Sequence, residues 1–189
     1  MPEVIDPRNL LIKITSILER LKTPYMVTGG MAVFVWGRAR FTADLDIVVE
    51  LKPKDIGQLS RALISLSEAG YIDQDAMQEA LDNQGEFNFL DGETGMKVDF
   101  WVLRKDSFGL SSLKRRTVKE VLGKKVYFIS PEDLVLSKLR WFQEGGSSRH
   151  LEDAESVLRN CGKRLDKKYL KQWARRLQVL DALAGLSSF

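Results

Sequence analysis

The segment DLDIVVEL, residues 44–51, constrains the fold of this chain more than any other part of it. Polar and apolar residues alternate along it, which is the period of a β-strand with one buried and one polar face. Asp44 and Asp46 therefore share one face with their Cα atoms about 6.5 Å apart, while Leu45 and Ile47 share the other. The sequence thus predicts a sheet in which one strand presents two carboxylates.

A second strand adds another carboxylate to this pattern. In MKVDFWV, residues 96–102, the alternation puts Asp99 and Trp101 on the face opposite the apolar residues. If the two strands are neighbours, three carboxylates converge, and desolvating them is costly unless a cation such as Mg²⁺ or Mn²⁺ compensates their charge. We therefore predict a divalent-metal site at Asp44, Asp46 and Asp99. Two ions about 4 Å apart would activate a hydroxyl there and stabilise a leaving pyrophosphate.

A plainer interpretation of the acid pair stays open. A D-x-D sequence also occurs where a half-exposed sheet turns acids toward solvent, and buried structural acids would need Lys or Arg partners, of which none stands beside Asp44 or Asp46 in the sequence. The Gly29-Gly30 pair upstream favours the metal hypothesis, because a glycine turn before a helix lets backbone N–H groups approach phosphate oxygens. The same pair is equally consistent with an ordinary tight turn.

The remaining periodicities predict an α+β fold. Helices are expected at residues 7–21, 30–37, 56–70, 75–83, 131–144, 149–160 and 166–183. Strands are expected at residues 25–27, 44–51, 86–90, 96–103, 117–122 and 126–129. We expect residues 1–129 to form an α/β core, and residues 130–189 to form a C-terminal region of three helices.

Composition sets a few further limits. Hydrophobic residues make up 44% of the 189 residues, which suffices for a packed core, and a net charge of +3 is too small to indicate a nucleic-acid partner. Cys161, the only cysteine, cannot form an internal disulfide, which fits a reducing compartment. No stretch approaches the roughly 20 apolar residues that span a bilayer. We expect a soluble, cytoplasmic protein with no membrane partner.

Basic residues gather at two places in the sequence. The first group, on the expected last hairpin, is Lys114, Arg115, Arg116, Lys119, Lys124 and Lys125. The second group, on the expected final helix, is Lys163, Arg164, Lys167, Lys168, Lys171, Arg175 and Arg176. If both groups face the site, they would bind RNA or another polyanionic acceptor. Lys and Arg are also common on solvated helix faces, so the pattern alone does not decide.

The segment GGMAVFVWGRARFTADLDIVV, followed by KVDFWV, resembles the DNA polymerase β nucleotidyltransferase superfamily. The superfamily pattern is a Gly-Gly or Gly-Ser turn, an acid pair on a strand and a third acid on a later strand. The closer resemblance is to the small prokaryotic type, which includes AbiEii-like toxins and aminoglycoside nucleotidyltransferases. PEDLVLSKLRW and RHLEDA are similar to a later motif of that group, so the resemblance covers roughly residues 25–155.

The resemblance implies a fold and a set of site residues. The fold would be a nucleotidyltransferase-like mixed β-sheet with flanking helices, followed by a small C-terminal helical bundle. Asp44 and Asp46 would bind metal, and Asp99 would bind metal and help to take the proton from the acceptor hydroxyl. The nucleotide-binding residues implied are Gly29, Gly30, Arg40, Thr42, Lys138, Arg149 and Asp153.

The resulting hypothesis is a metal-dependent nucleotidyltransferase that moves a nucleoside monophosphate from an NTP, such as ATP, to a hydroxyl acceptor. The acceptors that the resemblance implies are an RNA or tRNA end, a protein and a small molecule. The biological setting it implies is a toxin–antitoxin or defence pair with a cognate antitoxin. The alternative is a catalytically silent nucleotide-binding or protein-interaction module, because Met31 stands where many relatives have Ser or Thr.

Overall fold

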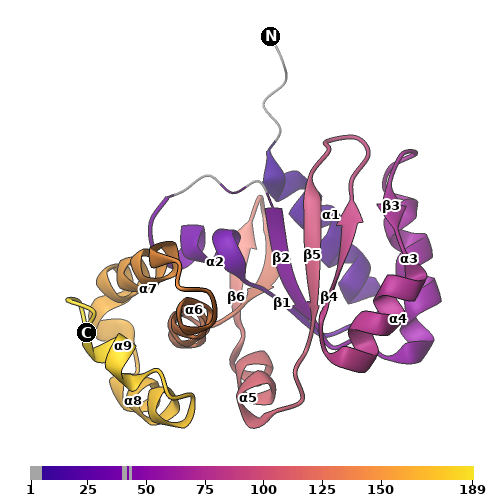
Figure 1. Ribbon diagram of the computed structural model, residues 1–189. Coiled ribbons are helices and arrows are strands. Elements are labelled where there is room, and N and C mark those ends of the chain that lie inside the picture. Colours follow the sequence, from indigo (N-terminus) through magenta and orange to yellow (C-terminus); the bar gives the residue numbers. More distant parts are fainter. Residues whose placement is uncertain (1–5, 40–41, 43) are drawn as a thin grey trace. The chain divides into compact units, whose positions relative to one another are not determined.

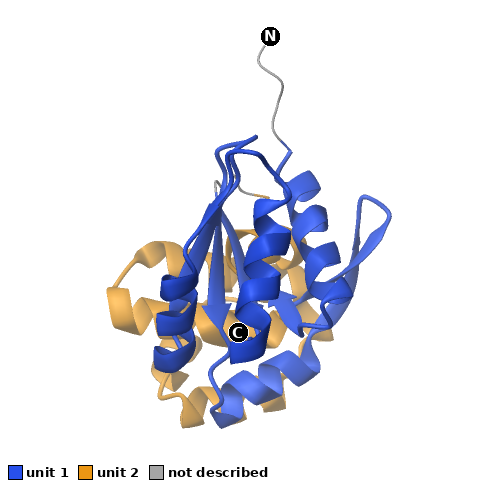
Figure 2. Ribbon diagram, turned by 90° about the vertical axis from the view of Figure 1, so that its right-hand side faces the viewer, with its two compact units in different colours: residues 1–28, 42–128 blue, residues 29–41, 129–189 orange. Residues whose placement is uncertain are grey.

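The computed structural model describes residues 6–39, 42 and 44–189. It contains two compact units, shown in different colours in Figure 2. The first comprises residues 1–28 and 42–128, and the second comprises residues 29–41 and 129–189. The short segment 29–41 thus groups with the C-terminal helices. The division after residue 129 into two domains stays a prediction.

The first unit is built on a mixed seven-stranded sheet with the strand order β3-β4-β5-β2-β1-β7-β6. The strands are β1 (Tyr25–Val27), β2 (Asp44–Val49), β3 (Tyr71–Ile72), β4 (Glu86–Leu90), β5 (Lys97–Val102), β6 (Thr117–Val121) and β7 (Lys124–Phe128). β2 runs parallel to β5 on one side and antiparallel to β1 on the other. The predicted mixed sheet with flanking helices is therefore confirmed.

Helices line one face of this sheet (Figure 1). The helices of the first unit are α1 (Pro7–Arg20), the 3-10 helix η1 (Pro53–Asp55), α3 (Ile56–Ile64), α4 (Gln74–Asn83) and α5 (Ser107–Arg115). α1 packs against β7, α4 packs against β4 and β5, and α3 lies between α1 and α4. Leu11, Ile14 and Leu18 of α1 are fully buried, as the helical spacing of its apolar residues requires. The polar residues of the central strands consequently lie on the other face.

The second unit is helical. Its helices are α2 (Gly29–Trp36), α6 (Pro131–Gly145), α7 (Ser148–Cys161), the 3-10 helix η2 (Gly162–Arg164), α8 (Lys167–Arg176) and α9 (Leu180–Ala184). α2 is apolar all round and packs against both α6 and α7. Trp36 at its end donates Nε1–H to the carbonyl of Ile129 at 2.9 Å, while Asn160 Nδ2 donates to the Trp36 carbonyl at 2.9 Å. These bonds fix the C-terminal end of α2 within the unit.

Two predicted helices have other bounds in the structure, and two elements were not predicted. The expected helix at residues 166–183 is wrong as a single helix, because Gln178 has a φ of 59° and separates α8 from α9. The described part of the C-terminal region accordingly holds four α-helices, α6 to α9, and not three. α3 ends at Ile64 and does not continue to Gly70. β3 and α5 were not predicted, and Lys114 and Arg115 lie on α5 and not on the expected hairpin.

Candidate active site

The two acidic strands are direct neighbours in the sheet. The parallel register pairs Asp44 with Lys97 and Asp46 with Asp99. Cα atoms paired in this way on adjacent strands lie about 4.8 Å apart. Because side chains alternate along each strand, Asp44, Asp46 and Asp99 all project from one face of the sheet. The structure thus brings together the three carboxylates that the sequence singled out.

The apolar residues of the same strands fix this register. Leu45 and Ile47 of β2 and Val98 and Phe100 of β5 are fully buried on the opposite face. A slip of one residue would move this apolar set to the polar face and bury the acids in its place. The position of the carboxylates is therefore a consequence of packing on the other side of the sheet.

Asp99 is the most buried of the three acids, with 7% of its surface exposed. Its Oδ2 accepts a charge-assisted hydrogen bond from Lys97 Nζ at 2.8 Å. Its Oδ1 is also buried and has no hydrogen-bond partner among the described residues. A buried carboxylate oxygen without a partner is costly and is a natural position for a cation or for a donating hydroxyl group.

Lys97 is a site residue that the sequence analysis missed. Its place two residues before Asp99 on a strand puts it on the same face, and that spacing was the available signal. The pKa of Lys97 is raised, chiefly by its hydrogen bond to Asp99, and the negative charges of Asp99, Asp44 and Glu86 add to the effect. Lys97 supplies the basic partner that the plainer interpretation of the acids requires.

Glu86 on β4 is a further acid on this face. β4 runs antiparallel to β5, and its register pairs Asn88 with Asp99 and Glu86 with Trp101. Partial burial raises the pKa of Glu86, and the negative charges of Asp99 and Asp46 raise it further, while Lys97 acts in the opposite direction. The charges of Asp99, Asp46 and Lys97 thus all act on Glu86. A cation bound at a face that carries several carboxylates would be stabilised by their charge.

The acid face fits a divalent metal ion by its donor chemistry. Within residues 6–39, 42 and 44–189, no group of three His, Cys, Asp or Glu side chains is arranged to hold a metal ion as it stands. Lys97 contacts Asp99 Oδ2, and this ion pair accounts for part of the charge that a metal would otherwise neutralise. The carboxylate oxygens, the excess negative charge and the unpaired Oδ1 of Asp99 nevertheless match the ligands that Mg²⁺ and Mn²⁺ prefer.

The glycine turn lies where the sequence predicted it. Gly29 has a φ of 57°, a conformation that favours glycine, and it begins α2. Thr28, the residue before it, donates its N–H to the carbonyl of Asp46 at 2.9 Å, so the chain is tied to β2 just before the turn. Gly30 is buried, and the Met31 residue that follows it is 5% exposed.

Two predicted phosphate contacts precede the acid pair. Thr42 donates its hydroxyl to the carbonyl of Asp44 at 2.9 Å, so its proton already has an acceptor in the backbone. Its hydroxyl oxygen stays half-exposed with the rest of the side chain. Arg40 lies outside the described residues. The roles of both residues toward a nucleotide stay predictions.

A second charged cluster lies in the helical unit. Asp153 of α7 is fully buried, and its Oδ2 pairs with Nζ of Lys138 on α6 at 3.1 Å. Its Oδ1 accepts a hydrogen bond from Arg38 at 3.3 Å, and Arg38 also pairs with the exposed Glu152 at 2.9 Å. The structure therefore brings Lys138 and Asp153 together in one ion pair, and their role toward a nucleotide stays a prediction. Arg149, which the resemblance also implies as a nucleotide-binding residue, is exposed.

Arg38 is the second residue that the sequence analysis missed. The sequence contains Arg38 and Arg40 in the same short segment, and nothing in their spacing distinguishes them. The partner of Arg38 is set by the packing of α2 against α7, which brings the residue after α2 next to the first turns of α7. Only tertiary structure supplies that information.

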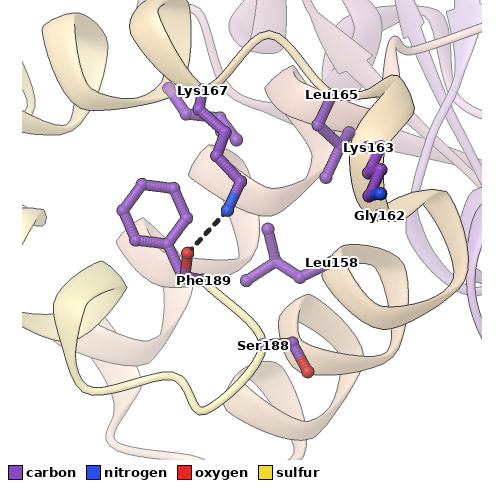
Figure 3. Close-up of a pocket in the computed structure, with 8 residues that line it drawn as sticks. Leu158, Gly162, Lys163, Leu165, Lys167, Ser188 and Phe189 are labelled. Atoms are coloured by element: carbon purple, nitrogen blue, oxygen red, sulfur yellow. Dashed lines mark hydrogen bonds between the residues drawn. The ribbon is translucent and has the colours of Figure 1, made fainter.

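A small pocket of about 180 Å³ lies elsewhere in the helical unit. Its lining residues are Leu158, Gly162, Lys163, Leu165, Lys167, Leu170, Ser188 and Phe189. Figure 3 shows Nζ of Lys167 directed at the carbonyl of Phe189, to which it donates at 2.9 Å. The lining includes none of the predicted site residues, so we do not assign the nucleotide to this pocket.

Three of the basic residues of the first group lie on the β6–β7 hairpin at one edge of the sheet. Lys119 lies on β6 and Lys124 and Lys125 on β7, while Arg116 stacks on the ring of Tyr127 at 4.7 Å. In the second group, Lys167 and Lys171 lie over the ring of Phe189.

Of the helices in the described part of the chain, none has both the length and the apolar character needed to cross a bilayer.

Comparison with known proteins places this geometry among nucleotidyltransferases. A family model described as "Nucleotidyl transferase AbiEii toxin, Type IV TA system" matches residues 16–184. No curated protein sequence matches the chain significantly.

Solved structures give an independent comparison of the fold. The antibiotic-resistance factor ANT(2'')-Ia is 16% identical over 94% of this chain and 96% of its own, with a TM-score of 0.59. A nucleotidyltransferase-like protein from Paracoccidioides brasiliensis is 18% identical over 94% and 92%, with a TM-score of 0.54. The lincosamide adenylyltransferase LnuA is 14% identical over 82% and 98%, with a TM-score of 0.51. At these identities the likeness concerns the fold alone.

The first prediction concerns the ion pair on the acid face. Lys97→Met should lower the free energy of unfolding of the metal-free protein by about 1–2 kcal/mol, because buried Asp99 loses its partner. Added Mg²⁺ should then raise the melting temperature of the variant more than that of the wild type. Thermal denaturation with EDTA and with Mg²⁺ measures both effects, with exposed Lys54→Met as the matched control. Equal Mg²⁺-dependent shifts in all three proteins would contradict a cation site here.

The second prediction concerns the cluster in the helical unit. Asp153→Asn should cost about 3–5 kcal/mol of stability, because it leaves the ammonium of Lys138 buried without a charged partner. The neighbouring change Glu152→Gln removes only an exposed pair and should cost less than about 1 kcal/mol. Urea denaturation of the two variants compares these costs directly. Similar losses in both would show that burial of Asp153 does not control this cluster.

Proposed function

Because the chain belongs to the AbiEii nucleotidyl transferase toxin family and is therefore a nucleotidyltransferase, we propose that it transfers a nucleoside monophosphate from an NTP to a hydroxyl acceptor with the help of Mg²⁺ or Mn²⁺. In this reaction the acceptor oxygen forms a bond to the α-phosphorus and the bond from that phosphorus to the pyrophosphate oxygen breaks. The proton of the acceptor hydroxyl must leave at the same time.

One observation carries the proposal. Asp46 and Asp99 lie directly opposite each other on adjacent strands, and Asp44 projects from the same face one alternation along β2. Carboxylates that lie this close together repel one another, and a bound cation or a proton relieves that repulsion. A metal-dependent transfer reaction uses both, since it needs ligands for a cation and an acceptor for a proton.

The three acids take different parts in the proposed reaction. Asp44, Asp46 and Asp99 would hold the cation, and Lys97 positions the Asp99 side chain through its contact with Oδ2. Oδ1 of Asp99 then accepts a hydrogen bond from the attacking hydroxyl and takes its proton as the new bond forms. A divalent cation bound here supplies charge stabilisation to the α-phosphate and to the leaving pyrophosphate.

The phosphate contacts come from backbone and basic groups. The N–H groups at the start of α2, beginning with Gly29 and Gly30, are donors that an isolated helix leaves unpaired, and they suit phosphate oxygens. The resemblance also implies Lys138 and Arg40 as phosphate contacts, and Lys138 pairs with Asp153 at 3.1 Å. Met31 has no hydroxyl group, so none from that position takes part.

The family and its structural relatives support a biological role and several candidate acceptors. The matching family is described as the toxin of a type IV toxin–antitoxin system, which supports a toxin that is paired with a cognate antitoxin. Among the structural relatives, ANT(2'')-Ia was solved with adenylyl-2''-tobramycin and LnuA with lincomycin. An RNA end, a protein hydroxyl and a small molecule are thus all candidate acceptors for this chain.

The third prediction tests the transfer reaction. The purified protein is incubated with Mg²⁺, each NTP labelled at the α-phosphate, and an extract that contains RNA, protein and small molecules. The wild type should release pyrophosphate and transfer label, whereas Asp46→Asn and Asp99→Asn should lose at least about 100-fold in rate, because each removes one of the three carboxylates. Exposed Asp82→Asn on α4 is the matched control and should keep full activity.

Two results would count against this assignment. Undiminished transfer by folded Asp46→Asn would show that the acid pair is not the reaction centre. Tight binding of NTP with no release of pyrophosphate on any fraction of the extract would favour the catalytically silent module.

A further inference from the structure

The small pocket of the helical unit has a different chemistry from the acid face. Its walls come from the end of α7, from η2 and from the start of α8, together with the segment 188–189. Leu158, Leu165 and Leu170 are buried in these walls, with 2%, 8% and 0% of their surface exposed. Among the described residues that line the pocket, none is an Asp or a Glu. The pocket is therefore a largely apolar cavity with cationic groups and no anionic group in its lining.

The volume of the pocket suits one small ring. At about 180 Å³ it exceeds the roughly 150 Å³ of an engineered cavity, lined by Leu, Ile and Phe, that binds benzene. The ring of Phe189 forms part of the wall, and Nζ of Lys167 and Nζ of Lys171 lie 5.5 and 5.6 Å from its centroid. An aromatic ligand would meet this ring in a stacked or edge-to-face contact.

Hydrogen bonds hold the segment that contributes Phe189 to the wall. Ser187 and Ser188 both donate their hydroxyl groups to Oε1 of Glu155, at 2.6 and 2.5 Å. Lys167 donates Nζ–H to the carbonyl of Phe189 at 2.9 Å (Figure 3). Because these bonds already order the wall, a ligand would bind with little further loss of conformational entropy.

The lysines supply the charge of the pocket. Lys163 and Lys167 are exposed, so their ammonium groups lie toward solvent while the buried leucines form the interior. Lys163 forms no ion pair with any described residue. An ammonium carries several N–H donors, so Lys167 can bind a second acceptor in addition to the carbonyl of Phe189. Glu155 lies outside the lining, and Arg159 is 3.7 Å from its Oε1.

From this arrangement we propose that the pocket binds a small aromatic carboxylate. Its ring lies among Leu158, Leu165 and Leu170, and its carboxylate lies at Lys163 and Lys167. This site shares no residue with the acid face, and the proposal does not depend on the transfer reaction. Inorganic phosphate is the disfavoured ligand, because it has no apolar group for the leucine walls. A neutral ring would gain the apolar contacts alone.

The test is a titration of the nitrogen-15-labelled protein, followed by NMR, with benzoate, benzyl alcohol and inorganic phosphate as separate probes. Benzoate should shift the amide signals of Gly162, Leu165 and Leu170 at concentrations on the order of 1 mM. Benzyl alcohol has the same ring without the charge and should bind at least about 5-fold more weakly. Phosphate should leave the signals of the leucines unchanged.

Variants of the lysines test the part played by charge. Lys163→Gln should weaken the binding of benzoate at least about 5-fold and leave that of benzyl alcohol unchanged, because only the carboxylate uses the ammonium group. Exposed Lys168→Gln on α8, which lies outside the lining, is the matched control and should alter neither affinity. Since both lysines are exposed, neither change should prevent folding, and thermal denaturation checks this.

Three results would overturn the proposal. Equal affinities of the wild type for benzoate and benzyl alcohol would show that the ligand need not be an anion. Equal losses of benzoate affinity in Lys163→Gln and Lys168→Gln would show that only the general positive charge of the unit matters. Shifts confined to residues outside the lining, or none at about tenfold higher concentration, would exclude the site itself. The transfer reaction has its own readout, the release of pyrophosphate, so its failure is distinguishable from each of these.

Discussion

The register between β2 and β5 is the constraint on which the site depends. Fully buried apolar side chains on the helix-covered face, among them Ile47 and Phe100, hold the strands in the one alignment that keeps this face apolar. That alignment sets Asp46 opposite Asp99 on the other face. The free energy that fixes the carboxylates therefore comes from hydrophobic packing on the far side of the sheet and not from the acids themselves.

Repulsion between the carboxylates lowers the stability that this packing provides, and the surrounding charges set the size of that loss. Lys97 compensates Asp99 through one oxygen and leaves the other buried and unpaired. The charges of Asp99 and Asp46 also raise the pKa of Glu86 on the neighbouring strand. Carboxylates that repel one another in this way are common at functional sites, where a bound cation relieves the repulsion. The proposed metal site is consistent with this arrangement.

Most of the sheet could be predicted from the sequence, because alternation reports directly which face a side chain occupies. The acid face followed from that rule, and Lys97 would have followed too, had the same rule been applied to the residue two before Asp99. β3 and α5 were not predicted from the sequence, for different reasons. β3 has two residues and exists through its pairing with β4, while α5 begins at a cap on Asp106 in a segment for which the sequence analysis expected no element. The pairing of Arg38 with Asp153 depends on helix packing, which no local pattern encodes.

The measurement that tests the account most directly is X-ray diffraction, near the manganese absorption edge, from crystals grown with Mn²⁺ and a non-hydrolysable NTP analogue. The account predicts anomalous peaks within coordination distance of carboxylate oxygens of Asp44, Asp46 and Asp99, with the α-phosphate of the analogue on the same ions. Manganese bound elsewhere, or an acid face on which Lys97 alone contacts Asp99 while the analogue is bound, would contradict it.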